Sequence, residues 1–127
     1  MVHVIESEKS VGEAARDLEE AVKAHGFGVL HVYDLKAKLA EKGVDLPREC
    51  RILEVCNPRQ AARVLAASMS VSLALPCRIS VYEDGGKTKI GTLLPGALLE
   101  VFPGTEEIKE VATEVETTLL AIMADAR

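Results

Sequence analysis

Two β-rich runs joined by a short glycine turn restrict the fold more than any other feature of this chain. The runs are Cys77 to Glu83 (CRISVYE) and Lys87 to Leu94 (KTKIGTLL), and Asp84-Gly85-Gly86 lies between them. This turn sequence predicts a β-hairpin, because glycine adopts the positive φ angles that a tight hairpin turn requires. The two strands are therefore expected to be antiparallel, which excludes a purely parallel sheet.

An amphipathic helix is expected between Ser10 and Gly26. Ser10 and Glu13 fit a capping box, in which each side chain binds the free backbone amide of the other residue. Gly26 is a favourable C-terminal cap. The apolar residues in between recur every three or four positions, which predicts one buried stripe formed by Val11, Ala14, Ala15, Leu18, Ala21 and Val22.

A second long helix is expected after Thr105, which is a favoured N-cap residue. Acidic residues in its first turn interact favourably with the helix dipole. Its apolar stripe consists of Ile108, Val111, Ala112, Val115, Leu119, Ile122 and Met123. Its solvated side is expected to carry the acidic run of Glu106, Glu107, Glu110, Glu114 and Glu116.

The remaining elements are shorter. Further strands are expected over residues 2–6, 27–33 and 50–56. Asp34 caps a brief helix, and another begins at Asn57-Pro58, because Asn is favoured at the N-cap and Pro at the first helical position. This helix is expected to fray into residues 68–75 (SMSVSLAL), and Pro95-Gly96 is expected to end the last strand.

The predicted element order is β-α-β-(short α)-β-α-β-β-α. The chain of 127 residues contains no repeats or linkers, so we expect a single domain covering residues 1–127. We expect an α+β fold in which one mainly antiparallel sheet packs its inner face against the two long helices, with short extra helices. The outer face is then either exposed to solvent or paired with a second subunit.

Composition limits the classes of partner. The net charge of −5 argues against nucleic acid and anionic membranes, because both select clustered Lys and Arg. The first residues lack the basic flank and apolar run of a signal peptide, and no apolar segment approaches about 18 residues, so we expect a cytoplasmic protein. One Asn and one Gln in the whole chain resemble the amide depletion of thermophile proteins.

Cys56-Asn57 and Cys77-Arg78 form the candidate site, with Glu54 beside the first pair. Cys56 directly precedes a helix N-terminus, where free amides favour anions and lower the pKa of a thiol. The functional interpretation is a reactive thiol pair, or a pocket for an anion or small ligand with polar contacts from Asn57 and Arg78. In the structural interpretation, the cysteines are small buried hydrophobes and Asn57 only begins a helix.

The third and fourth strands decide whether these residues meet. If the strands are antiparallel, Cys56 and Cys77 lie at the same edge of the sheet. If a right-handed crossover joins parallel strands, the two cysteines lie at opposite ends. An odd count of three cysteines indicates free thiols rather than a disulfide framework.

Neither a metal site nor a cofactor is expected. The two thiols together with His3, His31 or Glu54 offer enough ligands, but no CxxC or HxxxH spacing supports a metal site. The chain also lacks GxSxG, and Asp84-Gly85-Gly86 lacks the Lys-Ser/Thr that follows a phosphate loop. The catalytic motifs that a sequence reveals most readily are therefore absent.

Several motifs, taken in order, carry a family resemblance. They are Phe27-Gly28, Asp34, EVCNP at 54–58, LPCR at 75–78, VYED at 81–84 and Pro95. Their spacing is similar to that of the domain of unknown function 302 family, over about residues 8 to 125. The resemblance implies a β-α-β4-α arrangement like that of TATA-box-binding-protein-like domains, formed as a homodimer. It implies no established reaction.

These residues support two functional hypotheses. The first is a non-enzymatic homodimeric domain that binds a small ligand or a protein partner at the edge bearing Glu54, Cys56, Asn57, Cys77 and Arg78. The second is a thiol-based redox enzyme or sensor in which Cys56 attacks and Cys77 resolves. The two hypotheses differ in one property, because a redox pair requires an exposed thiol of low pKa and a packing pair does not.

Overall fold

Five strands form one antiparallel sheet in the computed structural model, which describes residues 1–127. The strands are β1 (Val2–Ser7), β2 (Gly28–Asp34), β3 (Cys50–Cys56), β4 (Cys77–Asp84) and β5 (Lys87–Leu93). Their order across the sheet is β1-β5-β4-β3-β2, and every neighbouring pair is antiparallel. The predicted α+β fold with one antiparallel sheet is confirmed.

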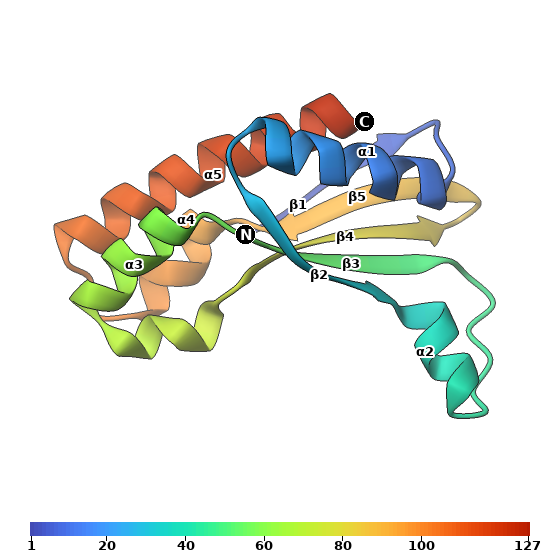
Figure 1. Ribbon diagram of the computed structural model, residues 1–127, viewed down its shortest axis with the longest axis horizontal. Coiled ribbons are helices and arrows are strands. Elements are labelled where there is room, and N and C mark those ends of the chain that lie inside the picture. Colours follow the sequence, from blue (N-terminus) through green and yellow to red (C-terminus); the bar gives the residue numbers. More distant parts are fainter.

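Two long helices, α1 (Val11–Ala24) and α5 (Glu106–Ala126), lie side by side on one face of the sheet (Figure 1). The shorter elements are the α-helices α2 (Leu35–Glu41), α3 (Pro58–Ala67) and α4 (Pro95–Leu98), and the 3₁₀ helices η1 (Met69–Ala74) and η2 (Leu99–Val101). In Figure 1, α3 and α4 gather at one end of the sheet, whereas α2 projects from the other end. No helix is both long enough and apolar enough to span a membrane.

The core lies between the inner face of the sheet and the two long helices. All residues of the two predicted helical stripes are buried. They pack against inward-facing strand residues, namely Leu53, Val55, Ile79, Val81 and Ile90. Burying one such side chain contributes roughly 1.5–3 kcal/mol, so this layer is the main source of stability and fixes how α5 lies over the sheet.

Side-chain caps define where the helices begin. The Oδ1 atom of Asn57 accepts a hydrogen bond from the Gln60 amide at 3.1 Å, which confirms the predicted start of α3. Only half of the predicted capping box forms at Ser10. Its Oγ atom accepts from the Glu13 amide, but the Glu13 carboxylate binds the Ser10 hydroxyl instead of the Ser10 amide. The hydroxyl therefore takes the place of the amide as the donor to this carboxylate.

The hairpin turn between β4 and β5 is confirmed. Asp84 ends β4 and Lys87 begins β5, so the turn has two central residues. These are Gly85 and Gly86, with φ angles of +60° and +76°. Two consecutive positive φ angles match the twist of the flanking strands and strongly favour glycine.

The chain segments around the candidate site are more ordered than the sequence indicates. Residues that were expected to fray or form a loop after α3 make the 3₁₀ helix η1. Pro95 ends β5 as predicted, but it also begins the single turn of α4. Proline suits this position because the first helical residue has no intrahelical acceptor for its amide. The two short segments close one end of the sheet.

Candidate functional site

The two cysteines of the candidate site lie at the same edge of the sheet. Strands β3 and β4 are antiparallel, and Val55 is the direct partner of Cys77 in their register. Cys56 follows Val55, so it lies next to the start of β4. The antiparallel alternative is therefore the correct one. Cys50 lies at the other end of β3, away from this edge.

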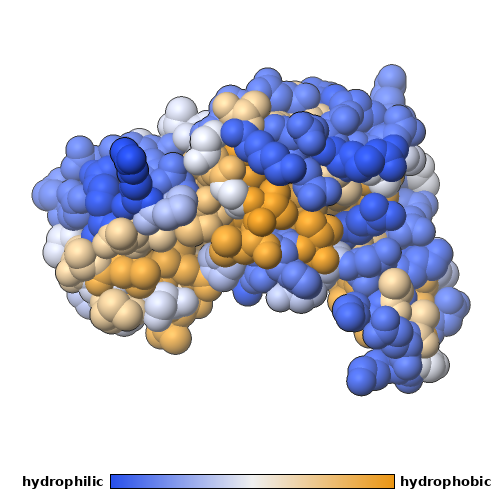
Figure 2. Space-filling view, in the orientation of Figure 1, coloured by the Kyte–Doolittle hydropathy of each residue, from blue (hydrophilic) through white to orange (hydrophobic).

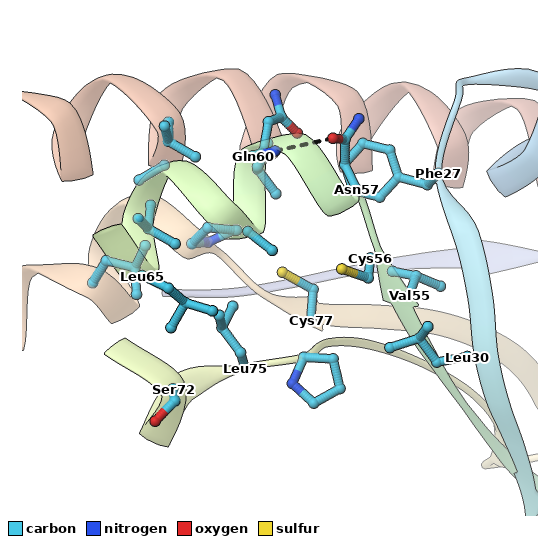
Figure 3. Close-up of a pocket in the computed structure, with 18 residues that line it drawn as sticks. Phe27, Leu30, Val55, Cys56, Asn57, Gln60, Leu65, Ser72, Leu75 and Cys77 are labelled. Carbon is cyan, nitrogen blue, oxygen red and sulfur yellow. Dashed lines mark hydrogen bonds between the residues drawn. The ribbon is translucent and has the colours of Figure 1, made fainter. Parts of the chain in front are cut away.

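An apolar cavity of about 350 Å³ lies at this edge. Both cysteines line it, and Figure 3 shows their sulfur atoms pointing into the same space. Its walls come from β2, β3, α3, η1, β4 and the segment before it, α4, η2 and α5. The lining residues are Phe27, Leu30, Val55, Cys56, Asn57, Gln60, Ala61, Val64, Leu65, Ser72, Leu75, Pro76, Cys77, Pro95, Leu99, Val111, Ala112 and Val115. Such an apolar cavity with few polar groups is typical of small-molecule sites.

Exposed apolar side chains lie close to this cavity. Leu30, at the irregularity in the β2–β3 pairing, lines the cavity and is nevertheless 59% exposed. Met69 and Leu73, in the η1 segment that also supplies Ser72 to the lining, are 69% and 84% exposed. Figure 2 shows the corresponding apolar areas, one around β2 and one over η1. An apolar ligand would therefore meet apolar surface before it enters the cavity.

Burial keeps the two thiols uncharged. Burial, together with a smaller effect of the nearby Cys56, raises the pKa of Cys77 to about 11, while Arg78 opposes both effects. Burial also raises the pKa of Cys56. Both shifts are opposite to the lowering expected for a reactive thiol at a helix N-terminus. The arrangement disfavours thiol redox chemistry and makes both side chains apolar parts of the wall.

Asn57 and Gln60 are the main polar side chains of the cavity wall. The Oδ1 atom of Asn57 caps α3, and its Nδ2 group makes no hydrogen bond within the chain. The Nε2 atom of Gln60 donates to Glu114 at 3.2 Å, whereas its Oε1 atom is buried without a partner. A buried carbonyl oxygen without a donor is unfavourable. The wall thus contains one free donor and one free acceptor.

Glu54 and Arg78 lie apart from the cysteines, on the outer face of the sheet. They are direct partners in the β3–β4 register, and Arg78 Nη2 lies 3.2 Å from Glu54 Oε2. The Tyr33 hydroxyl donates to the other oxygen of Glu54 at 2.9 Å. This hydrogen bond raises the pKa of Tyr33. Arg78 points away from Cys77 because consecutive residues of a strand point to opposite faces. Cys56, two residues after Glu54, reaches the cavity from the end of β3, so the five predicted site residues form two groups.

The sequence did not indicate that α5 and α3 together build the cavity wall. Arg63 of α3 binds two carboxylates of α5, with Nε 2.7 Å from Glu107 Oε1 and Nη1 2.9 Å from Glu114 Oε2. Glu116 accepts a hydrogen bond from the Gly96 amide of α4 at 3.1 Å. The acidic run of α5 was predicted to form only the solvated side of the helix, but it has a second role. It also holds α3 and α4 in place around the cavity.

Comparisons with known proteins agree with this architecture. A family model described as "Domain of unknown function DUF302" matches residues 3–126. The crystal structure of an uncharacterized conserved protein DUF302 from Bacillus stearothermophilus is similar, with 38% sequence identity and a TM-score of 0.92. The similarity covers 99% of this chain and 98% of that chain. No curated protein matches this sequence.

Proposed function

The chain belongs to the DUF302 family, whose name assigns no activity, and we propose that it binds a small apolar molecule in the cavity beside Cys56, Asn57 and Cys77. In this proposal the domain is a binding module rather than an enzyme. The cavity carries the proposal, because 13 of its 18 lining residues are hydrophobic. Its volume of about 350 Å³ is within the range of about 300–1,000 Å³ found for ligand sites.

The chemistry of the wall supports binding rather than catalysis. No lining residue is an Asp, Glu, His, Lys or Arg, so the cavity contains no ordinary acid–base pair. The two thiols are uncharged near neutral pH because burial raises their pKa values. The Asn57 amide and the unpartnered Gln60 oxygen supply the few polar contacts that orient a ligand.

A small molecule suits this site better than a protein segment. The cavity is lined by short elements and by α5, and Arg63 of α3 holds this wall by binding Glu107 and Glu114 of α5. A protein chain entering it would have to leave backbone amides and carbonyls without partners in an apolar space. A compact ligand that is mostly hydrocarbon avoids this cost.

We further propose that the chain pairs with a second copy through the outer face of its sheet. No helix covers this face (Figure 1). Exposed apolar residues lie on β1 and β5, namely Val2, Val4 and Leu93. The same face carries both signs of charge, in Asp84 with Lys89. Such a mixed face can match itself under a two-fold rotation. Sedimentation equilibrium of the wild type and of Val4→Glu tests this, and a monomeric wild type contradicts it.

Binding can be tested with N-phenyl-1-naphthylamine, a neutral apolar fluorophore. We expect saturable binding with one molecule per chain. Ala61 lines the cavity and Ala62 of the same helix is exposed, so the two positions give a matched pair. Ala61→Phe is expected to weaken binding by occupying the cavity, whereas Ala62→Phe is expected to leave it unchanged. Circular dichroism confirms that both variants are folded.

Two outcomes oppose this function. Absence of saturable binding to the folded wild type contradicts a ligand cavity. Equal affinity in wild type and Ala61→Phe places the fluorophore elsewhere on the surface, which also contradicts the proposal. Rapid alkylation of Cys56 and Cys77 at neutral pH, together with failure to bind the fluorophore, would favour the thiol redox alternative.

A further inference from the structure

A second, smaller cavity adjoins the apolar one. Its volume is about 80 Å³, and it shares five lining residues with the main cavity: Leu75, Pro76, Cys77, Pro95 and Leu99. Arg78 also lines the small cavity. Cys77 and Arg78 are consecutive in β4, so their side chains leave opposite faces of the sheet. The small cavity is therefore lined both by Cys77 of the apolar wall and by Arg78 of the outer face.

The guanidinium of Arg78 is held in place but keeps free donors. One nitrogen, Nη2, binds Glu54, and Glu54 is in turn fixed by the Tyr33 hydroxyl. The Glu54 side chain is only 13% exposed, whereas that of Arg78 is 58% exposed. No other acceptor in the chain binds Arg78. Since a guanidinium has five N–H donors in a fixed plane, most of them remain available to a ligand, and Glu54 acts as a positioning residue.

We propose that the ligand is a small monocarboxylic acid with an apolar tail, whose tail fills the main cavity and whose carboxylate binds Arg78. This inference rests on the proposed function, since it names the ligand class of the same site. The tail contacts the apolar lining of the main cavity. The carboxylate lies on the side of Pro76 and Cys77, where the two cavities share lining residues, and accepts hydrogen bonds from the free guanidinium nitrogens.

The charges around both cavities select a single negative charge. Arg78 is the one charged residue among the lining residues of the two cavities. A cationic head group would be repelled by its guanidinium. Because Glu54 already balances Arg78, a carboxylate adds one net negative charge, whereas a phosphate monoester dianion adds two and is repelled more strongly. A monocarboxylate has the charge and the planar geometry that one arginine binds best.

The test compares octanoate with 1-octanol, which has a similar tail and no charge, by isothermal titration calorimetry at pH 7. We expect the wild type to bind octanoate up to about fivefold more tightly, since an exposed ion pair contributes about 0.2–1 kcal/mol. Arg78→Gln is expected to abolish the preference and leave the affinity for 1-octanol unchanged. Arg48→Gln is the control, because Arg48 is also an exposed arginine paired with a carboxylate, that of Asp84.

The outcomes separate this inference from the proposed function. If 1-octanol binds but octanoate binds no more tightly, the carboxylate inference is wrong and the apolar site stands. If the preference persists in Arg78→Gln or is lost equally in Arg48→Gln, Arg78 is not the head-group residue and the inference is also wrong. If neither compound binds the folded wild type, both the inference and the proposed function are overturned.

Discussion

Cys77 is expected to react far more slowly with alkylating reagents than an ordinary cysteine. Burial is the main reason that its pKa rises to about 11, and only the thiolate is a nucleophile. At pH 8 a thiol with this pKa is about one part in a thousand thiolate, whereas a free cysteine with a pKa of about 8.5 is about one quarter thiolate. Ionisation alone therefore predicts alkylation that is slower by roughly 200-fold.

The assay is iodoacetamide labelling of the folded protein between pH 7 and 10, with peptide mapping to follow each cysteine separately. The same protein in denaturant is the control, since unfolding exposes Cys77 and returns its pKa to the ordinary range. The rate is expected to keep rising with pH beyond pH 9 instead of reaching a plateau. A ligand in the cavity is expected to slow it further, because Cys77 lines the cavity wall.

A low apparent pKa would refute this reasoning. If Cys77 in the folded protein reacts with an apparent pKa at or below about 8.5, burial does not control its ionisation. The thiol pair would then be a chemical site, and the redox hypothesis would replace ligand binding. A reaction that is slow only because of restricted access is distinguished by its pH dependence, since access lowers the rate at every pH without shifting the profile.

Three further predictions concern stability. Cys77 has a higher pKa in the folded than in the unfolded state, so its contribution to the free energy of unfolding is fully present below about pH 8.5 and is lost as the pH rises through about 11. The loss totals roughly 3 kcal/mol. Urea unfolding measured against pH should show a smaller loss of stability at alkaline pH in Cys77→Ala than in the wild type. Arg63→Met removes the ion pairs with Glu107 and Glu114 and should lower the free energy of unfolding in urea by about 1 kcal/mol, given 0.2–1 kcal/mol per exposed pair. Arg59 is an exposed residue of the same helix without such pairs, so Arg59→Met should leave stability unchanged. Equal losses in the two variants would contradict a stabilising role of the Arg63 ion pairs. The low amide content predicts a calorimetric Tm above the range of about 45–65 °C that is usual for mesophile domains, and a Tm within that range would contradict the thermophile interpretation.

The fold was predictable because its main signals are local. Ser10 and Thr105 each place a capping oxygen beside a free amide within three residues, so the sequence alone shows where α1 and α5 begin. The periodic apolar stripes of both helices then specify their buried faces. Gly85 and Gly86 specify the hairpin in the same way. Each of these features depends on residues that are close together in the chain.

The site was only partly predictable because its contacts are distant in sequence. Cys56 and Cys77 were expected to be neighbours only under one of two topologies, and the β3–β4 pairing decided between them. The interaction between Arg63 and Glu107 joins residues 44 positions apart, and nothing in either local sequence indicates it. Glu54 and Arg78 were assigned to the same site as the cysteines, although strand alternation places their ion pair on the outer face.

The cavity exists because small residues meet where the short elements join the sheet. Ala61 of α3 and Ala112 of α5 both line it, and the chain has only four aromatic residues, two Phe and two Tyr, of which Phe27 alone reaches the wall. An unfilled apolar volume destabilises a fold in proportion to its size. The ion pairs of Arg63 with α5 and the hydrogen bond between Gly96 and Glu116 hold α3 and α4 in place against α5 around the cavity. The polar contacts on α5 therefore act together with the small lining residues to shape the apolar cavity.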